Sequence, residues 1–262
     1  MNTAACIVER TYGVELNVVH GGTKFHGTTK TIENREKYLR SRLKPAFRGT
    51  GMHGGFSLHR TEQGATIRHS FCVGGQMLFG SNDVFGANVS LPDQPLDGLE
   101  GIFGSLGDAL GAYSGRFLPS SIAARLHEVQ FRAKCISWWP RPSDMTLEEA
   151  QLPVICRDAE GQRSPFQPEC FGWLNYWSSD VCKYVSFPYN ASSNDRLHCR
   201  RTPTNAWLVR LGDEPLQPVD EHMKLLREMY TAFPKVGERY FDTASEQAGQ
   251  DLADNPARSS FQ

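Results

Sequence analysis

The side chains of this 262-residue chain that could do chemistry are first of all its seven cysteines and eight histidines. Thiolates and imidazoles bind zinc, and a thiolate beside an imidazole can act as a nucleophile. A zinc site built from Cys170, Cys182, His198 and Cys199 is conceivable, but structural zinc sites usually use close ligand pairs, and the chain contains no CxxC. Their wide spacing and odd number favour free thiols that serve mostly as small core side chains.

No other motif nominates a catalytic or binding site. Residues 49–54, GTGMHG, match GxGxxG in their letters, but a dinucleotide site needs a strand before the motif and a helix after it, so we expect a flexible loop. The chain has no phosphate loop, no GxSxG and no HExxH, and its spacing singles out no Cys–His nucleophile pair. Five histidines could line a metal site, but none pairs at a known ligand spacing: His20, His26, His53, His59 and His69. We predict no catalytic residue, no cofactor and no metal.

Composition and charge argue against several classes of partner. The net charge is −1, which gives no overall field to attract nucleic acid or an anionic membrane. Charge is nevertheless uneven, at +6 over residues 1–70 and −5 over residues 211–262. The first residues lack the pattern of a secretory signal, and no window has about eighteen consecutive apolar residues. We therefore expect a cytoplasmic protein that binds neither nucleic acid nor membrane.

Hydrophobic periodicity predicts helices and strands without a strict βαβ rhythm. The expected strands are 14–20, 55–59, 65–73, 88–91, 151–157, 171–178 and 206–211. The expected helices are 31–44 with Thr31 as N-cap, 98–115, 119–137 and 219–233, and 189–205 is expected to be a loop. This order favours an α+β fold, in which a mostly antiparallel sheet carries packed helices, as a single domain over residues 1–241. The polar tail 242–262 is predicted to be disordered.

Two of these helices have competing interpretations. Glycine recurs every three or four residues along 98–115, which fits a weak helix pressed closely against a neighbour, or a glycine zipper within a membrane. Glu100 and Asp108 argue against the membrane alternative. The second half of 119–137 could also alternate as a strand.

The most distinctive stretch is FGWLNYWSS, residues 171–179. In a strand, alternate residues point to opposite faces. One face would carry Phe171, Trp173, Asn175 and Trp177, and the other Gly172, Leu174, Tyr176 and Ser178. Because both faces carry bulk, and exposing either would be costly, we predict a central core strand and not a binding surface.

This stretch also resembles a family motif. Residues 172–178, GWLNYWS, are similar to the GWL-[TN]-Y-[aromatic/aliphatic]-S segment of the immunity protein 52 family of bacterial polymorphic-toxin systems. The elements after the motif come in a similar order too, namely a polar loop, the strand AWLVRL, an acidic turn at 212–215 and an amphipathic helix. Upstream, Trp138-Trp139-Pro140 resembles the Trp-x-Pro element of the family. The resemblance implies that five residues belong to the scaffold of the fold: Gly172, Trp173, Leu174, Tyr176 and Trp138. Residues 98–115 and the tail have no counterpart in the family.

Membership would imply a non-enzymatic immunity protein (antitoxin). Such a protein binds and neutralises a cognate restriction-endonuclease-like DNase toxin, in some cases a type VI secretion effector, and so protects the producing cell in bacterial competition. An acidic face would suit a basic nuclease cleft, which points to the toxin-binding residues Asp213, Glu214, Asp220 and Glu221. The same carboxylates could simply stabilise a helix N-terminus. Two further alternatives are a secretion adaptor or chaperone without inhibitory role, and a Cys/His hydrolase.

Overall fold

A computed structural model describes most of the chain between residues 2 and 237. The described residues are 2–12, 16, 18–21, 28–31, 33–34, 36–37, 53–59, 66–72, 84–88, 96–132, 142–153, 155–156, 166–189 and 195–237. Most of the predicted 31–44 helix, the first part of GTGMHG, Trp138 with its neighbours and the tail 242–262 lie outside these residues.

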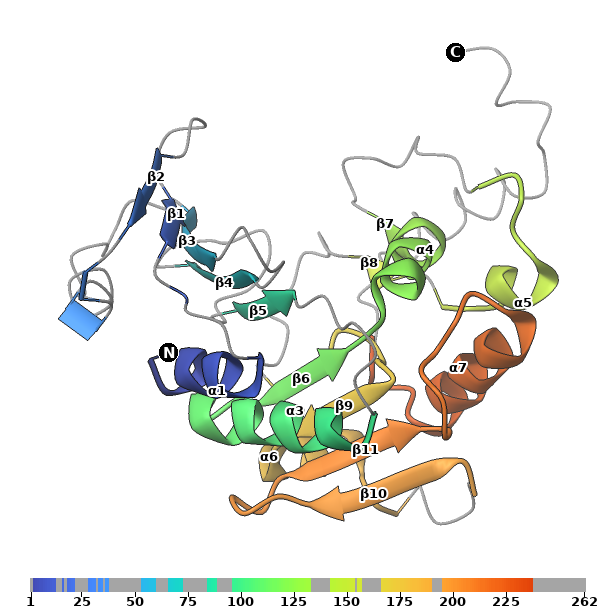
Figure 1. The fold of residues 1–262 in the computed structure, drawn as a ribbon. Helices are drawn as coiled ribbons and strands as arrows, with labels where there is room; N and C mark the ends of the chain where they lie inside the picture. The colour runs from blue at the N-terminus through green and yellow to red at the C-terminus, as the bar shows by residue number, and fades with distance from the viewer. Residues whose placement is uncertain are drawn as a thin grey trace.

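The centre of the structure is a four-stranded antiparallel sheet (Figure 1). Its strands are β6 (Ser114–Phe117), β9 (Leu174–Trp177), β10 (Leu197–Arg201) and β11 (Trp207–Leu211), in the order β10-β11-β9-β6. The register pairs Tyr176 of β9 with Leu208 on one side and with Gly115 on the other. The aromatic stretch therefore supplies an interior strand, and all four residues of β9 are buried, as predicted.

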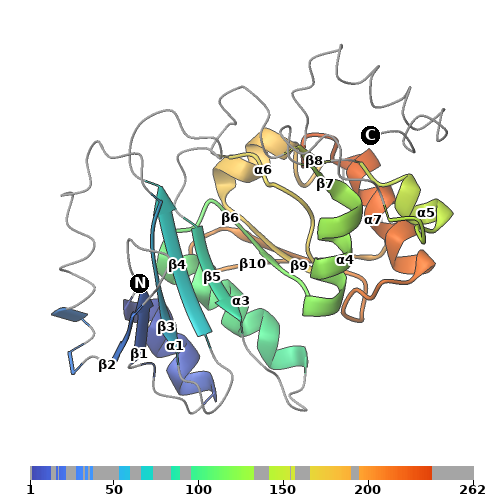
Figure 2. The ribbon, with the colours of Figure 1, turned by 90° about the horizontal axis from the view of Figure 1, so that it is seen from above.

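Helices cover both faces of this sheet, as Figure 2 shows from above. One face packs against α3 (Leu96–Leu110), with α1 (Asn2–Tyr12) lying along α3. The other face carries α4 (Ser120–Gln130), α6 (Ser179–Val185) and α7 (Asp220–Ala232), and α5 (Leu147–Ala150) packs on α7. The larger hydrophobic core fills this second side, where Phe171, Trp177 and Phe233 form a cluster of ring contacts.

Two further sets of strands complete the described fold. A five-stranded antiparallel sheet has the order β2-β1-β3-β4-β5. Its strands are β1 (Val18–Gly21), β2 (Thr28–Thr31), β3 (His53–His59), β4 (Thr66–Cys72) and β5 (Val84–Asn88). The short strands β7 (Phe131–Arg132) and β8 (Ile155–Cys156) pair in parallel. The predicted α+β class, with mostly antiparallel sheets and packed helices, is confirmed.

The glycines of α3 let the helix approach the sheet closely. A Cβ atom at Gly104 would lie 2.8 Å from Leu208 Cδ1, and one at Gly107 would overlap the Tyr176 ring. Gly98 and Gly101, on the exposed side, have nothing within 4 Å of such an atom. The prediction of a helix pressed against a neighbour is therefore confirmed up to Leu110, whereas Ser114 and Gly115, also predicted as helix, belong to β6. No helix in the described part is long and apolar enough to span a membrane.

Some sequence predictions were wrong. Residues 189–205 were expected to be a loop, yet 197–201 form β10. Thr31 was expected to cap a helix, but it ends β2, and the Lys37 N–H is instead bonded to Asn34 Oδ1 at 2.9 Å. The helix predicted over 119–137 ends at Gln130. Residues 131–132, in the half of the segment where a strand was the alternative, form β7. The helices α1, α5 and α6 were not predicted.

Each error has a local physical reason. β10 is an edge strand whose side chains, apart from Leu197, are exposed, so it has no alternating apolar signal. α5 spans four residues and is fixed by a capping box, in which the Thr146 side chain accepts from the Glu149 N–H while Glu149 accepts from the Thr146 N–H. α6 similarly begins at a Ser178 cap. Such short helices depend on caps and packing more than on periodicity.

The two sides of α3 allow a matched test of its packing. We expect Gly107→Ala to destabilise the protein by about 2 kcal/mol or more, because its methyl group must displace the buried Tyr176 ring. Gly101→Ala, in the same helix with open space around it, should stabilise by about 0.5–1 kcal/mol through helix propensity. Urea unfolding measures both. Equal effects of the two substitutions would show that α3 does not pack as described.

Candidate functional site

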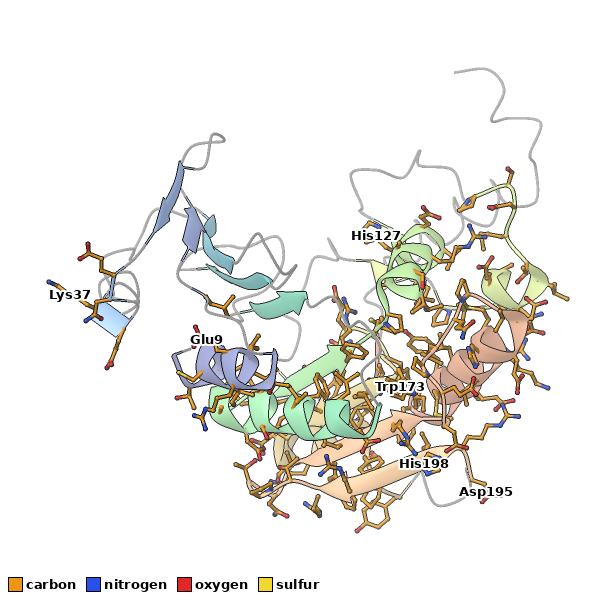
Figure 3. All side chains as sticks on the ribbon, viewed as in Figure 1. Glu9, Lys37, His127, Trp173, Asp195 and His198 are labelled. Carbon is orange, nitrogen blue, oxygen red and sulfur yellow. The ribbon has the colours of Figure 1, made fainter. Side chains whose placement is uncertain are left out.

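The predicted acidic residues lie at the two ends of the connection from β11 to α7. Gly212, with φ +71°, turns the chain after β11, and Asp213 and Glu214 follow in exposed positions. Asp213 has partners within the chain, since its Oδ1 lies 3.0 Å from His198 Nε2 and 3.5 Å from Arg210 NH2. Figure 3 labels His198 and Asp195 at this end of the sheet.

The other acidic pair occupies the first turn of α7. Asp220 and Glu221 are exposed, and the buried Leu216 lies in the connection between the two pairs. Within the described residues, the side chains of Glu214, Asp220 and Glu221 make no hydrogen bond or ion pair. The structure thus places the four carboxylates at the two ends of one connection, and all four are exposed.

The N-cap of α7 is an apolar residue beside these acids. Val219 caps the helix without a side-chain hydrogen bond, and 46% of its surface is exposed. The backbone N–H of Gln217, in the connection before α7, donates a hydrogen bond to His222 Nδ1 at 2.8 Å. Valine is among the poorest N-cap residues, so its presence here does not serve helix stability.

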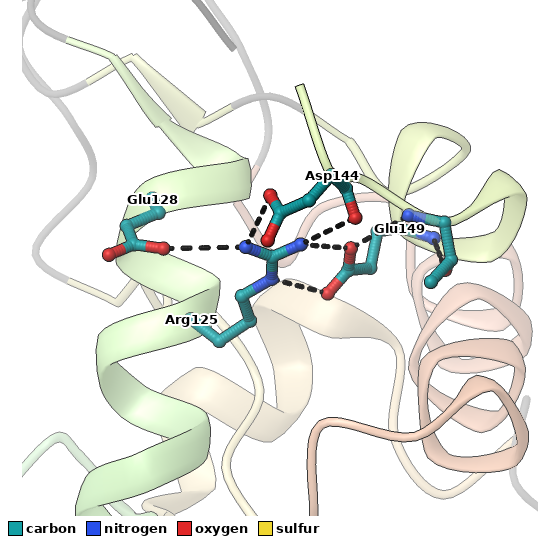
Figure 4. A network of polar contacts seen from close by, with 5 residues as sticks. Arg125, Glu128, Asp144 and Glu149 are labelled. Carbon is teal, nitrogen blue, oxygen red and sulfur yellow. Dashed lines mark hydrogen bonds and ion pairs between the residues drawn. The ribbon is translucent and has the colours of Figure 1, made fainter. Parts of the chain in front are cut away.

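A buried ion pair joins α4 to α5 (Figure 4). The Arg125 guanidinium donates to both Glu149 oxygens, at 2.6 and 2.7 Å, and also to Asp144 Oδ1 at 3.1 Å. The Glu149 side chain is almost fully buried. The hydrogen bonds from Arg125 lower the pKa of Glu149 against the opposing effect of burial. This bidentate geometry makes the network a tether for α5.

A second polar cluster ties α3 to the hairpin of β10 and β11. Asp108 Oδ1 accepts hydrogen bonds from the hydroxyls of Tyr176 and Thr202, each at 2.8 Å, and from Thr204. Burial alone would raise the pKa of Asp108, but these three hydrogen bonds together lower it. The cluster holds the end of α3 in place, and sequence spacing gave no signal for it because Thr202 is 94 residues away.

The described cysteines do not form the zinc quartet considered from the sequence. Cys6, Cys170, Cys182 and Cys199 are free thiols, and no three metal-binding side chains in the described part stand close enough to hold an ion. Burial raises the pKa of the Cys182 thiol to about 11, which disfavours its thiolate. Cys199 is exposed on the edge strand β10.

Cys170 has a different environment, made by an arginine of β6. Arg116 NH1 donates to the Cys170 sulfur, and Arg116 NH2 lies 3.1 Å from the carboxylate of Glu169. Burial lowers the pKa of Arg116, but its attraction to Cys170 and Glu169 more than compensates and raises it. The guanidinium is therefore charged and lies directly against a thiol.

The motif residues lie within the scaffold. Trp173 and Tyr176 are buried in the core, together with Leu174, while Gly172 lies where a Cβ atom would approach the Phe117 carbonyl oxygen to 2.7 Å. These positions explain the pattern GWLNY by packing and hydrogen bonding. They offer no surface to a partner.

Comparison with known proteins places this scaffold in a family. A family model described as "Domain of unknown function (DUF5953)" matches residues 60–241, which is more than two thirds of the chain. The chain belongs to the DUF5953 family. The match covers the whole four-stranded sheet with α3 to α7, while α1 and β1 to β3 precede it. No curated protein and no solved structure matches.

The Asp108 cluster predicts a specific pH dependence. A carboxylate whose pKa is lower in the folded state than in the unfolded chain adds stability above its ordinary value near 4, and this contribution is lost as the pH falls through the folded value. Asp108→Asn should therefore destabilise the protein at pH 7, and its difference from the unmodified protein should shrink toward pH 3. Urea unfolding at the two pH values measures this. A difference that does not change with pH would contradict it.

The Arg125 tether predicts strong coupling between two residues. Arg125→Met should cost about 3 kcal/mol or more, because it leaves the buried Glu149 carboxylate without its partner. Adding Glu149→Gln should recover part of the loss, and a double-mutant cycle gives the coupling energy. As a control, removing the exposed partner with Glu128→Gln should change stability by less than about 0.5 kcal/mol.

Proposed function

We propose that this protein is an immunity protein that binds and neutralises a cognate nuclease toxin. We further propose that it belongs to the immunity protein 52 family and that the toxin is a DNase effector of a type VI secretion system. This proposal is supported by the resemblance of residues 172–178 and by the strand, the acidic turn and the amphipathic helix that follow between residues 206 and 233.

The observation that carries the proposal is the exposed surface at the start of α7. This surface, called here the α7 entry, consists of Glu214, Val219, Asp220 and Glu221. It combines carboxylates that are open to solvent with an apolar side chain that is 46% exposed. A protein interface uses apolar contacts for affinity and charges for orientation and association rate. A basic nuclease cleft is complementary to such a surface.

Binding and inhibition need separate measurements. The protein and the toxin encoded beside its gene should form a one-to-one complex, and mixing them should abolish DNA cleavage. Binding without loss of cleavage would favour the adaptor or chaperone alternative. Full cleavage together with no complex at saturating protein would refute the proposal.

Val219→Ser separates binding from folding at the α7 entry. A serine N-cap should stabilise α7 by about 1 kcal/mol, because its side chain can accept a backbone hydrogen bond that valine cannot. The same substitution removes an exposed apolar contact, so we expect toxin affinity to fall by roughly tenfold, or about 1.4 kcal/mol. Thermal unfolding and calorimetric titration measure the two effects.

Two charge-removing variants of α7 test the carboxylates. The double substitution Asp220→Asn and Glu221→Gln should slow association and weaken its dependence on salt. Glu228→Gln, an exposed residue two turns further along the same helix, serves as the control and should bind nearly as the unmodified protein does. If the control slows association as much as the double variant does, the α7 entry is not the contact surface.

A further inference from the structure

Strand β10 leaves one edge of the four-stranded sheet open, as Figure 1 shows. Its pairing with β11 is fixed at both ends by hydrogen bonds. The Gly212 N–H donates to the Arg196 carbonyl at 2.8 Å, and the Thr202 N–H donates to the Ala206 carbonyl at 2.9 Å. Successive residues of an antiparallel strand turn their backbone groups to opposite sides. The even-numbered residues of β10 therefore face β11.

The odd-numbered residues of β10 turn their backbone groups toward the open edge. They are Leu197, Cys199 and Arg201. Among the described residues, no backbone group pairs with their N–H and C=O groups. A row of such groups is a template on which another strand can pair.

The side chains along this edge carry one sign of charge. The strand contains His198, Arg200 and Arg201 and no carboxylate. Arg200 shares the single carboxylate of Glu100 with Arg210, at 3.2 and 2.8 Å. Arg201 is exposed and has no carboxylate partner among the described residues. Carboxylates on an incoming strand would therefore complement β10.

The same charges argue against a second copy of this chain as the partner. Two copies of β10 paired about Cys199 would place His198 of each opposite Arg200 of the other. Centring the pair on His198 or Arg200 instead brings that residue opposite its own counterpart. Like charges directly opposite each other are destabilising, so the edge favours an acidic strand from a different protein.

This edge begins beside the α7 entry. His198 Nε2 lies 3.0 Å from Asp213 Oδ1, and Glu214 of the α7 entry follows directly in the chain. We propose that the toxin binds this edge with an acidic extended segment, which adds a strand beside β10. The proposal rests on the proposed function. Main-chain hydrogen bonds to the odd-numbered residues hold the segment, and its carboxylates set the register.

Hydrogen exchange at single amides tests the added strand. In the free protein, the outward amides of Leu197, Cys199 and Arg201 should exchange fast, and those of His198 and Arg200, which face β11, more slowly. In the complex with the toxin, we expect the three outward amides to be protected by at least about tenfold.

The outcomes separate this proposal from toxin binding itself. A complex in which the three outward amides stay unprotected refutes the added strand and leaves toxin binding intact. The absence of any complex at saturating protein refutes both. Protection of the same amides in the free protein as its concentration is raised would show that a second copy occupies the edge, and would overturn the proposal.

A matched pair of variants at Cys199 tests the backbone contact. Cys199→Pro removes an outward N–H that β11 does not use, and proline is tolerated on an edge strand in that orientation. We expect it to lower toxin affinity by roughly tenfold. Cys199→Ala keeps the N–H and should bind nearly as the unmodified protein does. Equal affinities of the two variants, both folded by near-ultraviolet circular dichroism, would contradict the added strand.

Variants of Arg201 test the charge of the segment and serve where Cys199→Pro unfolds. Arg201→Glu places a carboxylate against the acidic segment, so toxin affinity should fall by roughly tenfold. Arg201→Lys keeps the charge and should retain most of the affinity. An affinity of folded Arg201→Glu that equals or exceeds that of the unmodified protein would refute an acidic segment.

Discussion

The fold depends on a hydrogen-bonded closure between Gly172 and Asn175 at the start of β9. Asn175 is 1% exposed, and its Oδ1 accepts the Gly172 N–H at 2.8 Å. Its Nδ2 donates to the Gly172 carbonyl at 2.9 Å and to the Val209 carbonyl at 3.2 Å. A buried amide without such partners would be destabilising by about 1–3 kcal/mol, so this residue specifies one local geometry. Because the closure also reaches β11, it sets β9 against its neighbour.

The remainder of the core is arranged around this closure. With Gly172 fixed, the Trp173 N–H reaches the Phe117 carbonyl, and the Trp173 carbonyl accepts the Leu211 N–H, each at 2.9 Å. Alternate side chains then face the two helix layers, with Tyr176 toward α3 and Trp177 toward the cluster around Phe233. The motif GWLNYWS is therefore a folding motif. A likeness in this segment speaks for a shared scaffold, and function has to be sought on the surface around it.

The sequence allowed the prediction of the elements that are buried and periodic. The apolar stripe of α7 and the aromatic alternation of β9 are intrinsic signals, because each arises from burial of a defined face. β10 gave no such signal because it is an exposed edge strand, and α5 rests on the capping box of Thr146 and Glu149, a pattern that could have been found. The polar clusters could not be predicted, since Arg116 and Cys170 are 54 residues apart and meet only in the folded chain.

The acidic residues before and within α7 have two interpretations from the sequence, as a binding surface or as charges that stabilise a helix N-terminus. Interaction with the helix dipole falls off beyond the first turn, so it accounts for Asp220 and Glu221 but not for Glu214. It also fails to account for Val219, because a chain selected for helix stability would place serine, threonine or aspartate at the N-cap. Helix stabilisation thus explains half of the α7 entry. The other half is costly or neutral for folding, and the proposed contact with a toxin would give it a physical reason.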